Sequence, residues 1–323
     1  MNSLTLSKIK LNSIKQIETF FLSPASPRPL GILRIGLSLV LLAQAFLIRG
    51  SIFDFFSHDG LVQGELADYL STPGTPKISW LVHAVAGLGI SESFCIQATC
   101  LVYVLSLGLL AVGLFTRTAS ILTWTLHWTL MNTGYTTAYG VDLYAHVFLF
   151  YLMWIPAGAA FSLDVLWGRR SSEASTPARL GLRVIQLHLC ITYLCSGIEK
   201  ASGIQWWNGE LLWRALMLPV YRQWDMSWLA QWPLLSKLGG WSTLLFELGY
   251  CVFIWPKATR KLWVAAIVSL HLGIAIFLGL GLFGLIMCVL TFSVFGIAAE
   301  PRPKIYRSTA LNSDPLFSPE CAT

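Results

Sequence analysis

Residues 262–299 read LWVAAIVSLHLGIAIFLGLGLFGLIMCVLTFSVFGIAA, and none of them is Asp, Glu, Lys or Arg. A helix that crosses the hydrocarbon of a bilayer needs about 20 predominantly apolar residues. The stretch is long enough for two crossings, and we expect the chain to turn near Gly279–Gly281. It therefore predicts an integral membrane protein.

The composition of the whole chain agrees with this interpretation. Of its 323 residues, 55% are hydrophobic and only 12% are charged, whereas soluble domains carry about 25% charged residues. The mean hydropathy is +0.64. Such a chain has too few polar residues to cover a water-soluble globule and too few charges for a disordered chain. The class of soluble globular proteins is thereby excluded.

Other stretches that are poor in charge extend the prediction along the chain. We expect an all-α fold, a polytopic bundle of about eight transmembrane helices at 30–48, 94–115, 119–133, 143–160, 180–198, 239–255, 262–279 and 282–298. Residues 78–90 are apolar but short, so we place them at the membrane interface.

The positions of the cations predict the orientation of these spans. With both termini in the cytoplasm, fourteen Lys and Arg residues fall on the inner side, six on the outer side and two inside spans, which accounts for all 22. This asymmetry follows the positive-inside rule. We expect three parts: a cytoplasmic amphipathic segment at 1–24, the transmembrane domain at 25–298, and a polar cytoplasmic tail at 299–323.

Tryptophan is concentrated in the second of two long extracytoplasmic segments, 199–238. Six of the 14 Trp lie there, at positions 206, 207, 213, 224, 228 and 232. Trp favours the boundary between membrane and water. We expect a Trp-rich extracytoplasmic cap, and an aromatic belt alone explains the pattern as well as a binding pocket does.

Several classes of function lack their motifs. There is no basic helix with interleaved aromatics, so we expect no nucleic acid partner. The chain has no HExxH motif, no P-loop and no zinc-like spacing among its seven cysteines, so we expect no metal. Gly279-Leu-Gly281-Leu-Phe-Gly284 matches GxGxxG, but it lies in an apolar run without a preceding strand. We interpret it as a turn or close helix packing.

The strongest candidate for a catalytic motif is the stretch 195–209, CSGIEKASGIQWWNG. It places Glu199 and Lys200 at the end of a predicted span, directly before Trp206 and Trp207. A partly desolvated lysine is a usable base, although Glu199 would favour its charged form. The alternative is a lysine whose ammonium reaches the outer membrane surface.

Other polar residues at membrane depth are further candidates. His271 lies within the charge-free run, where it is either hydrogen-bonded to a neighbouring helix or a proton relay or hydrogen-bond donor to a quinone oxygen. Asp142 and His146 are four residues apart, so both can face one pocket. Arg34 and Glu247 are the remaining intramembrane charges, and we expect them to pair across helices as structural residues.

These residues, taken in order, resemble the HTTM domain that is shared with vitamin K-dependent gamma-carboxylase. The resemblance covers about residues 25–298. It rests on the run 195–209, on 29–35 with its Arg34, on the turn 156–158 before Ser162-Leu-Asp164, on Phe246-Glu247, on Arg260 and on His271.

The resemblance implies a specific chemistry. In the carboxylase, a lysine deprotonates reduced vitamin K, oxygen adds, and the strong base so formed removes a glutamate gamma-proton. Carbon dioxide traps the carbanion, and the quinone leaves as an epoxide. Carried over by motif, Lys200 is the base and His271 assists it by hydrogen bonding, and the Asp142 and His146 neighbourhood corresponds to a region that contributes polar groups to the active site. We expect Asp142, His146, Glu199, Trp206 and Trp207 to bind quinone or substrate on the extracytoplasmic side. We assign Arg34, Glu247 and Arg260 as structural intramembrane charges.

The implied cofactor is reduced vitamin K or a menaquinol-like quinone, with O2 and CO2. The carboxylase has a large extracytoplasmic portion after its membrane domain, whereas only about 25 polar residues follow the last predicted span here. We therefore expect a membrane enzyme that oxidises a quinol and modifies, by carboxylation or otherwise, a peptide or small substrate. The alternatives are a non-catalytic accessory protein that binds a lipid or peptide partner, and a transporter. Membrane lipids are expected contacts in every case.

Overall fold

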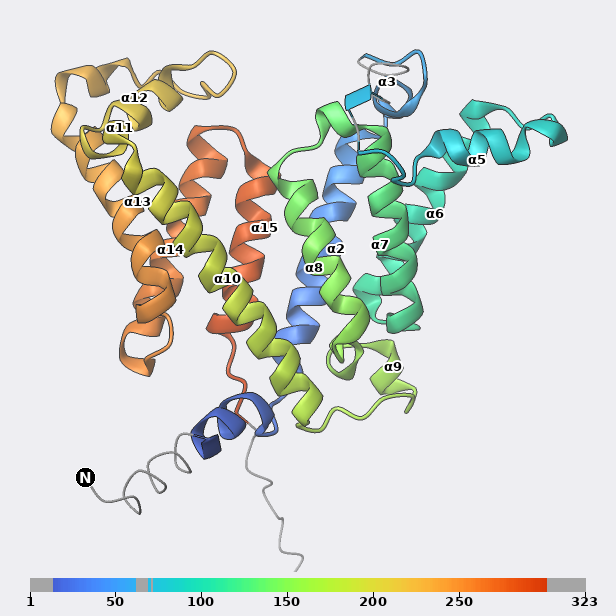
Figure 1. Ribbon diagram of the computed structural model, residues 1–323, viewed down its shortest axis with the longest axis horizontal. Coiled ribbons are helices and arrows are strands. Elements are labelled where there is room, and N and C mark those ends of the chain that lie inside the picture. Colours follow the sequence, from blue (N-terminus) through green and yellow to red (C-terminus); the bar gives the residue numbers. More distant parts are fainter. Residues whose placement is uncertain (1–13, 62–68, 71, 301–323) are drawn as a thin grey trace, which may run out of the picture.

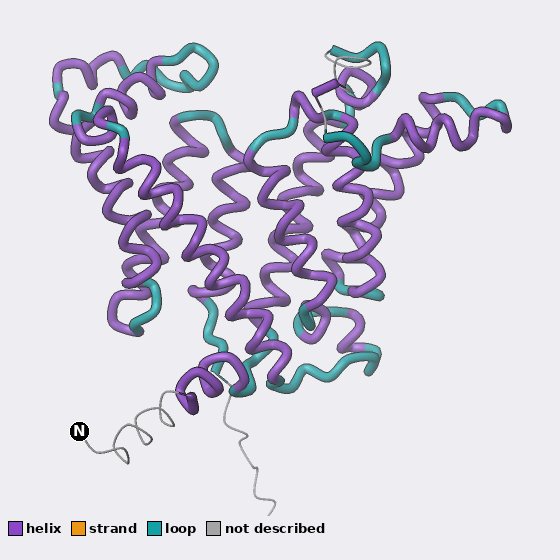
Figure 2. The backbone as a smooth tube through the Cα atoms, in the orientation of Figure 1, coloured by secondary structure: helices purple, strands orange, loops and turns teal. Residues whose placement is uncertain are grey.

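The computed structural model describes residues 14–61, 69–70 and 72–300, and these residues form helices joined by short loops (Figures 1 and 2). In this part of the chain the only β-type pairing is an isolated bridge between Ala25 and Ser175. The all-α class predicted from the sequence is confirmed. The predictions for 1–13 and 301–323 fall outside the described residues.

Each of the eight predicted spans overlaps one helix. The helices are α2 (Arg28–Ile48), α6 (Glu92–Val112), α7 (Thr116–Thr133), α8 (Gly140–Trp154), α10 (Thr176–Ser202), α13 (Pro233–Phe253), α14 (Lys257–Phe277) and α15 (Gly281–Thr291). Four of them, α2, α6, α10 and α14, are long and apolar enough to cross a membrane. The other four are shorter or more polar, so eight crossings remain a prediction.

The long helices form two groups that meet at α15. On one side α2, α6, α7 and α8 pack together, and on the other side α10, α13 and α14 do so (Figure 1). Helix α15 contacts α14 in one group and both α2 and α8 in the other. The buried core continues across this junction, from Leu37 and Phe148 to Ile267 and Ile286.

The turn predicted near Gly279–Gly281 is confirmed. Helix α14 ends at Phe277, α15 begins at Gly281, and Gly279 between them has a φ of 69°, in the left-handed region that favours glycine. A Cβ on Gly284 would lie 2.5 Å from the carbonyl oxygen of His271, so this glycine permits close packing of the two helices. The GxGxxG match is thus a turn followed by a packing contact.

Shorter helices gather at the end of the bundle opposite residues 14–22 and residue 300 (Figure 1). They are α3 (Ile52–Phe56), α5 (Ile78–Val85), η1 (Ala86–Leu88), η2 (Tyr135–Thr137), α11 (Ile204–Trp207), α12 (Glu210–Met217) and η4 (Ser227–Gln231). At the other end lie η3 (Ala157–Ala159), α9 (Leu163–Leu166) and η5 (Phe292–Gly296). Which end faces the cytoplasm remains a prediction.

Arg34 holds the second end together, and the predicted Arg34–Glu247 pair is wrong. The Arg34 side chain is fully buried and donates hydrogen bonds to four backbone carbonyls, two from the end of α6 and two from the loop before α9, namely those of Leu110, Ala111, Ala160 and Phe161. Glu247 instead pairs with a lysine on α10. Arg34 is structural, as expected, but through carbonyl groups.

Asp164 completes this arrangement by capping α7. Its carboxylate accepts hydrogen bonds from the backbone N–H groups of Phe115 and Thr116, both at 2.9 Å, and from the Thr116 hydroxyl at 2.7 Å. Burial raises the pKa of Asp164, but these hydrogen bonds and the charge of Arg169 outweigh burial and lower its pKa from 3.8. Arg34 and Asp164 thus belong to one structural cluster at this end of the bundle.

Arg260 makes comparable contacts at the turn between α13 and α14. Its guanidinium donates to the carbonyls of Ile254, at 3.2 Å, and Trp255, at 2.5 Å. These carbonyls lie at the C-terminal end of α13, where intrahelical donors are lacking. The structural role of Arg260 stays a prediction, and these contacts are what it would rest on.

Candidate functional site

A cavity of about 880 Å³, here called the lysine cavity, lies between α10, α13, α14 and α15. Helix α12 and the residues that follow it line one side. Lys200, Glu247 and His271 all line this cavity. The structure thus brings together three polar residues that are far apart in the sequence and come from three different helices.

Lys200 is the centre of the polar part of the lysine cavity. It lies in the last turn of α10, and its Nζ donates to Glu247 Oε2 at 2.8 Å. It also donates to the Ser196 hydroxyl, one helical turn earlier. The Trp206 ring lies 5.5 Å from Nζ, in position for a cation–π contact. The Lys200 ammonium is therefore positioned by three side chains, those of Glu247, Ser196 and Trp206.

Glu199, predicted to share the site with Lys200, does not lie in it. Its side chain is exposed and does not line the cavity. Consecutive residues on a helix point in different directions, so Glu199 and Lys200 cannot share a face. The acidic partner is Glu247 on α13, which is 8% exposed. Ser196 could have been predicted as a partner of Lys200, because it lies four residues earlier on the same helix. No local sequence pattern indicates Glu247.

Small residues bring α10 and α13 close enough for this ion pair. A Cβ on Gly197 would lie 3.0 Å from the backbone nitrogen of Leu248, the residue after Glu247. At Gly240, also on α13, a Cβ would collide with the backbone carbonyl of Trp206. Gly197 therefore allows the close approach of α10 and α13 that the Lys200–Glu247 ion pair needs, and Gly240 allows α11 to lie against α13.

We predict that Gly197→Ala separates α10 from α13 and weakens the Lys200–Glu247 contact. Overpacking of this kind costs about 1–3 kcal/mol, because Leu248 and its backbone must move. Gly108→Ala is the matched control: no atom lies within 4 Å of a Cβ at Gly108, on α6, and the change should stabilise by about 0.5–1 kcal/mol. Thermal unfolding of both variants in one detergent tests this. Equal melting temperatures would contradict the packing argument.

His271 offers one ring nitrogen to the lysine cavity. Its side chain is 4% exposed, and Nδ1 lies 2.9 Å from the carbonyl oxygen of Ile267. A carbonyl only accepts, so Nδ1 carries the proton and Nε2 of the neutral ring is an acceptor. The ring packs edge-on against Tyr193 and lies 6.0 Å from Phe283. The sequence left two roles open for His271, a structural hydrogen bond or participation in proton transfer. The observed geometry is compatible with both.

The two tryptophans of the motif have different positions. Trp206 lines the lysine cavity, whereas Trp207 is 47% exposed and does not line it. The Trp207 indole donates to the carbonyl of Ala201 at 2.8 Å. The structure thus supports contact with a ligand for Trp206 and gives Trp207 no place in the cavity.

Asp142 and His146 lie outside the lysine cavity. Asp142 lines a second cavity on the other side of α8, whereas His146 stacks on Trp124 with ring centroids 5.2 Å apart. Their i,i+4 spacing correctly predicts that both lie on one side of α8. It does not predict which helix packs against that side. From α8 it is Tyr144, which the sequence analysis missed, that lines the lysine cavity. Tyr193 and Thr243 were also missed.

Among the described residues, no group of three or more His, Cys, Asp and Glu side chains is placed to hold a metal ion. The polar groups that line the lysine cavity are an amine, a carboxylate, an imidazole, several hydroxyls and the guanidinium of Arg214. Such a set can bind hydrogen-bonding ligands and transfer protons.

Fold and site together define a helical protein with four helices apolar enough to cross a membrane and an acid–base cavity between its helices. The family model for the HTTM domain matches residues 83–297, more than half of the 323-residue chain. The chain belongs to the HTTM-domain family, which is related to vitamin K-dependent carboxylases. The comparisons found no match to a curated protein and none to a solved structure.

Proposed function

We propose that the protein is an integral membrane enzyme that binds a reduced lipophilic quinone in the lysine cavity and uses Lys200 as a general base. The observation that carries this proposal is that Lys200, Glu247 and His271 open into one largely apolar cavity of about 880 Å³. Small-molecule sites typically enclose about 300–1,000 Å³ and combine apolar walls with a few convergent polar groups.

The walls fit the chemistry of a quinol. Aromatic side chains that can pack against a ring, including Tyr144, Tyr193 and Phe283, line the cavity together with the apolar Leu270 and Ile274. A reduced vitamin K or menaquinol-like molecule has two ring hydroxyls and an apolar tail. When bound, it would supply the electrons that reduce O2, with CO2 as the co-substrate in a carboxylation.

In this proposal, Lys200 Nζ accepts a proton from a ring hydroxyl. For this step the amine must be neutral, and Glu247 Oε2, 2.8 Å from Nζ, holds it in position. Ser196 holds the amine in place. His271 Nε2 accepts a hydrogen bond from the substrate.

From the family relation, we propose that the substrate modified in this reaction is a peptide or a small carbon acid. We place the cavity on the extracytoplasmic side, with both termini in the cytoplasm, because the cation asymmetry predicts that orientation. Helix α12, which lines the cavity, lies at the end of the bundle opposite residues 14–22 (Figure 1).

Turnover in lipid nanodiscs tests the proposal. Reduced vitamin K or menaquinol is incubated with protein under O2, and quinone epoxide is measured by mass spectrometry. We expect epoxide from the wild type and from Lys257→Ala, a control at a lysine whose side chain is 84% exposed. We expect little epoxide from Lys200→Ala. Equal epoxide from folded Lys200→Ala and the wild type would refute the role of Lys200.

The second candidate is a non-catalytic accessory protein, and the exposed tryptophans favour it. Trp224 and Trp232, in the segment between α12 and α13, are 58% and 60% exposed. Trp is enriched where proteins bind partners or meet the membrane surface. This candidate predicts that Trp206→Ala or Trp207→Ala impairs recovery of a partner, whereas Lys200→Ala does not.

A further inference from the structure

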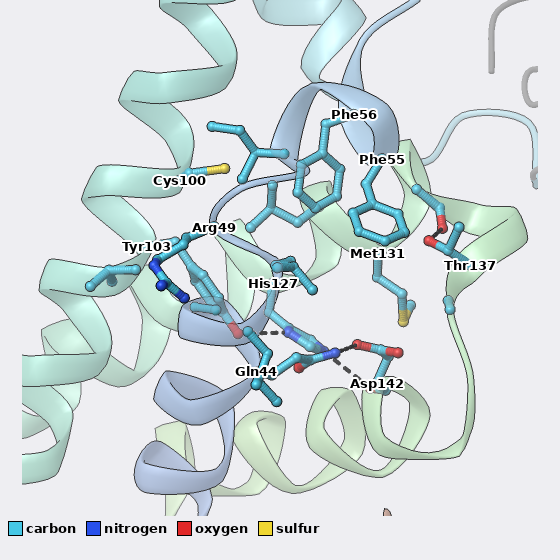
Figure 3. A pocket seen from close by; sticks show the side chains of 18 of the residues that line it. Gln44, Arg49, Phe55, Phe56, Cys100, Tyr103, His127, Met131, Thr137 and Asp142 are labelled. Atoms are coloured by element: carbon cyan, nitrogen blue, oxygen red, sulfur yellow. Dashed lines mark hydrogen bonds between the residues drawn. The ribbon is translucent and has the colours of Figure 1, made fainter. Parts of the chain in front are cut away.

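A second cavity of about 510 Å³ lies among α2, α3, α6, α7 and α8 (Figure 3). We call it the aspartate cavity after Asp142. It shares no lining residue with the lysine cavity. Between them stand α8 and α15, where the Tyr144 and Phe283 rings pack at 6.1 Å. The aspartate cavity is therefore a separate space, and the proposed quinol chemistry does not use it.

A buried chain of hydrogen bonds forms the base of the aspartate cavity (Figure 3). The Tyr103 hydroxyl lies 2.9 Å from His127 Nδ1, and His127 Nε2 lies 3.0 Å from the backbone carbonyl of Asp142. Because a carbonyl only accepts, Nε2 of the neutral ring donates and Nδ1 accepts from Tyr103. The lone pairs of the Tyr103 oxygen then remain available to a ligand.

The Asp142 carboxylate accepts its hydrogen bonds from neutral donors. It is 9% exposed and accepts from Gln44 Nε2 at 2.7 Å and from the Tyr139 backbone N–H at 3.0 Å. In the described part of the chain, no Lys, Arg or His lies within 4.0 Å of it to form an ion pair. Arg49 lines the same cavity, but it donates to the Phe46 carbonyl and stacks on that ring.

The remaining walls are apolar. Phe55 and Phe56 from α3 and Met131 from α7 lie on the side of the cavity that faces Asp142 (Figure 3). Ile52 of α3 and Leu130 of α7 also line the cavity. Such walls favour a hydrocarbon chain, while the inner end offers a carboxylate and further acceptor oxygens. A negative charge in low dielectric is strongly stabilised by an ion-pairing, hydrogen-bonding cation.

We propose that the aspartate cavity is a second binding site, for an amphiphile with an apolar chain and a cationic, hydrogen-bond-donating head, such as a long-chain amine. The ammonium pairs with Asp142 and donates to Gln44 Oε1 or Tyr103. The chain lies between the α3 phenylalanines and α7. This inference does not depend on the proposed quinol chemistry.

A matched series of eight-carbon probes tests the inference. Binding of radiolabelled octylamine, octanol and octanoate to the full chain in nanodiscs is measured by scintillation proximity, with empty nanodiscs subtracted. We expect octylamine to bind at least about tenfold more tightly than octanol, because hydrogen bonds to charged groups are stronger, and octanoate to bind least. Asp142→Asn should remove the preference for the amine. Ala45→Phe, on the cavity wall, should weaken binding of all three probes.

Two controls keep the result interpretable. Ile274→Phe, on the wall of the lysine cavity, should leave octylamine binding unchanged, and melting temperatures show that each variant folds. Should Asp142→Asn prove unfolded, Ala45→Phe alone still tests occupancy of the cavity. Equal affinity for the three probes, or octylamine binding that is unaffected by both variants, overturns the proposal. Loss of octylamine binding in Ile274→Phe would assign the probe to the lysine cavity and also overturn the proposal.

Discussion

Replacing Lys200 by Arg is expected to lower the rate of quinol oxidation by about 10²–10⁴-fold, the usual contribution of a general base. A guanidinium can retain the ion pair with Glu247, which lies 2.8 Å from Lys200 Nζ. It does not give up its proton at any pH where proteins fold, so it cannot act as a base. The rate of epoxide formation at saturating quinol measures the effect.

Glu247→Gln is the companion variant. Glutamine removes the negative charge but still offers an oxygen to Lys200 Nζ, so we expect a rate loss of less than about tenfold, well below that of Lys200→Arg. Lys200→Arg with near wild-type turnover would show that the cation, and not a proton acceptor, is what the reaction needs. A loss in Glu247→Gln as large as that in Lys200→Ala would identify the carboxylate as the base.

Arg34→Met is expected to destabilise the protein by several kcal/mol. Arg34 is fully buried, and its removal takes the donor from the carbonyls of Ala111, Ala160 and Phe161, while the Leu110 carbonyl keeps the N–H of Gly113. Each buried polar group that loses its partner costs about 1–3 kcal/mol. Arg49→Met is the control, because Arg49 is an exposed arginine at the end of the same helix that donates to the Phe46 carbonyl.

Thermal unfolding in one detergent compares the two variants. We expect Arg49→Met to lie within about 0.5 kcal/mol of the wild type, as is usual for surface substitutions. Arg34→Lys should recover part of the loss, because an ammonium keeps the charge but has fewer donors. An Arg34→Met protein as stable as Arg49→Met would contradict the structural role of Arg34.

The helical ranges were predictable because the bilayer imposes a length and a composition on each span. The charge-free run 262–299 gave both α14 and α15, and Gly279 marked the turn between them. Lys200 and His271 were chosen as polar residues in apolar surroundings, and the structure places both in one cavity. Their catalytic roles stay predictions.

The partners of these residues were not predictable, because they depend on which helices become neighbours. Glu247 lies 47 residues from Lys200 and reaches it only because α10 and α13 pack closely at Gly197. Arg34 pairs with carbonyl groups, which every residue has and no sequence pattern reveals. Asp142 was grouped with Lys200 by resemblance, although α8 directs it into the other cavity.

Rescue of Lys200→Ala by added primary amines tests the central claim most directly. The truncated side chain leaves space beside Glu247 and Ser196 for a small amine such as methylamine or ethylamine. If Lys200 is a general base, these amines restore epoxide formation, and the restored rate rises with amine basicity in a series of equal size. A folded Lys200→Ala protein whose turnover no amine restores, or restores without regard to basicity, would contradict the assignment of Lys200 as the base.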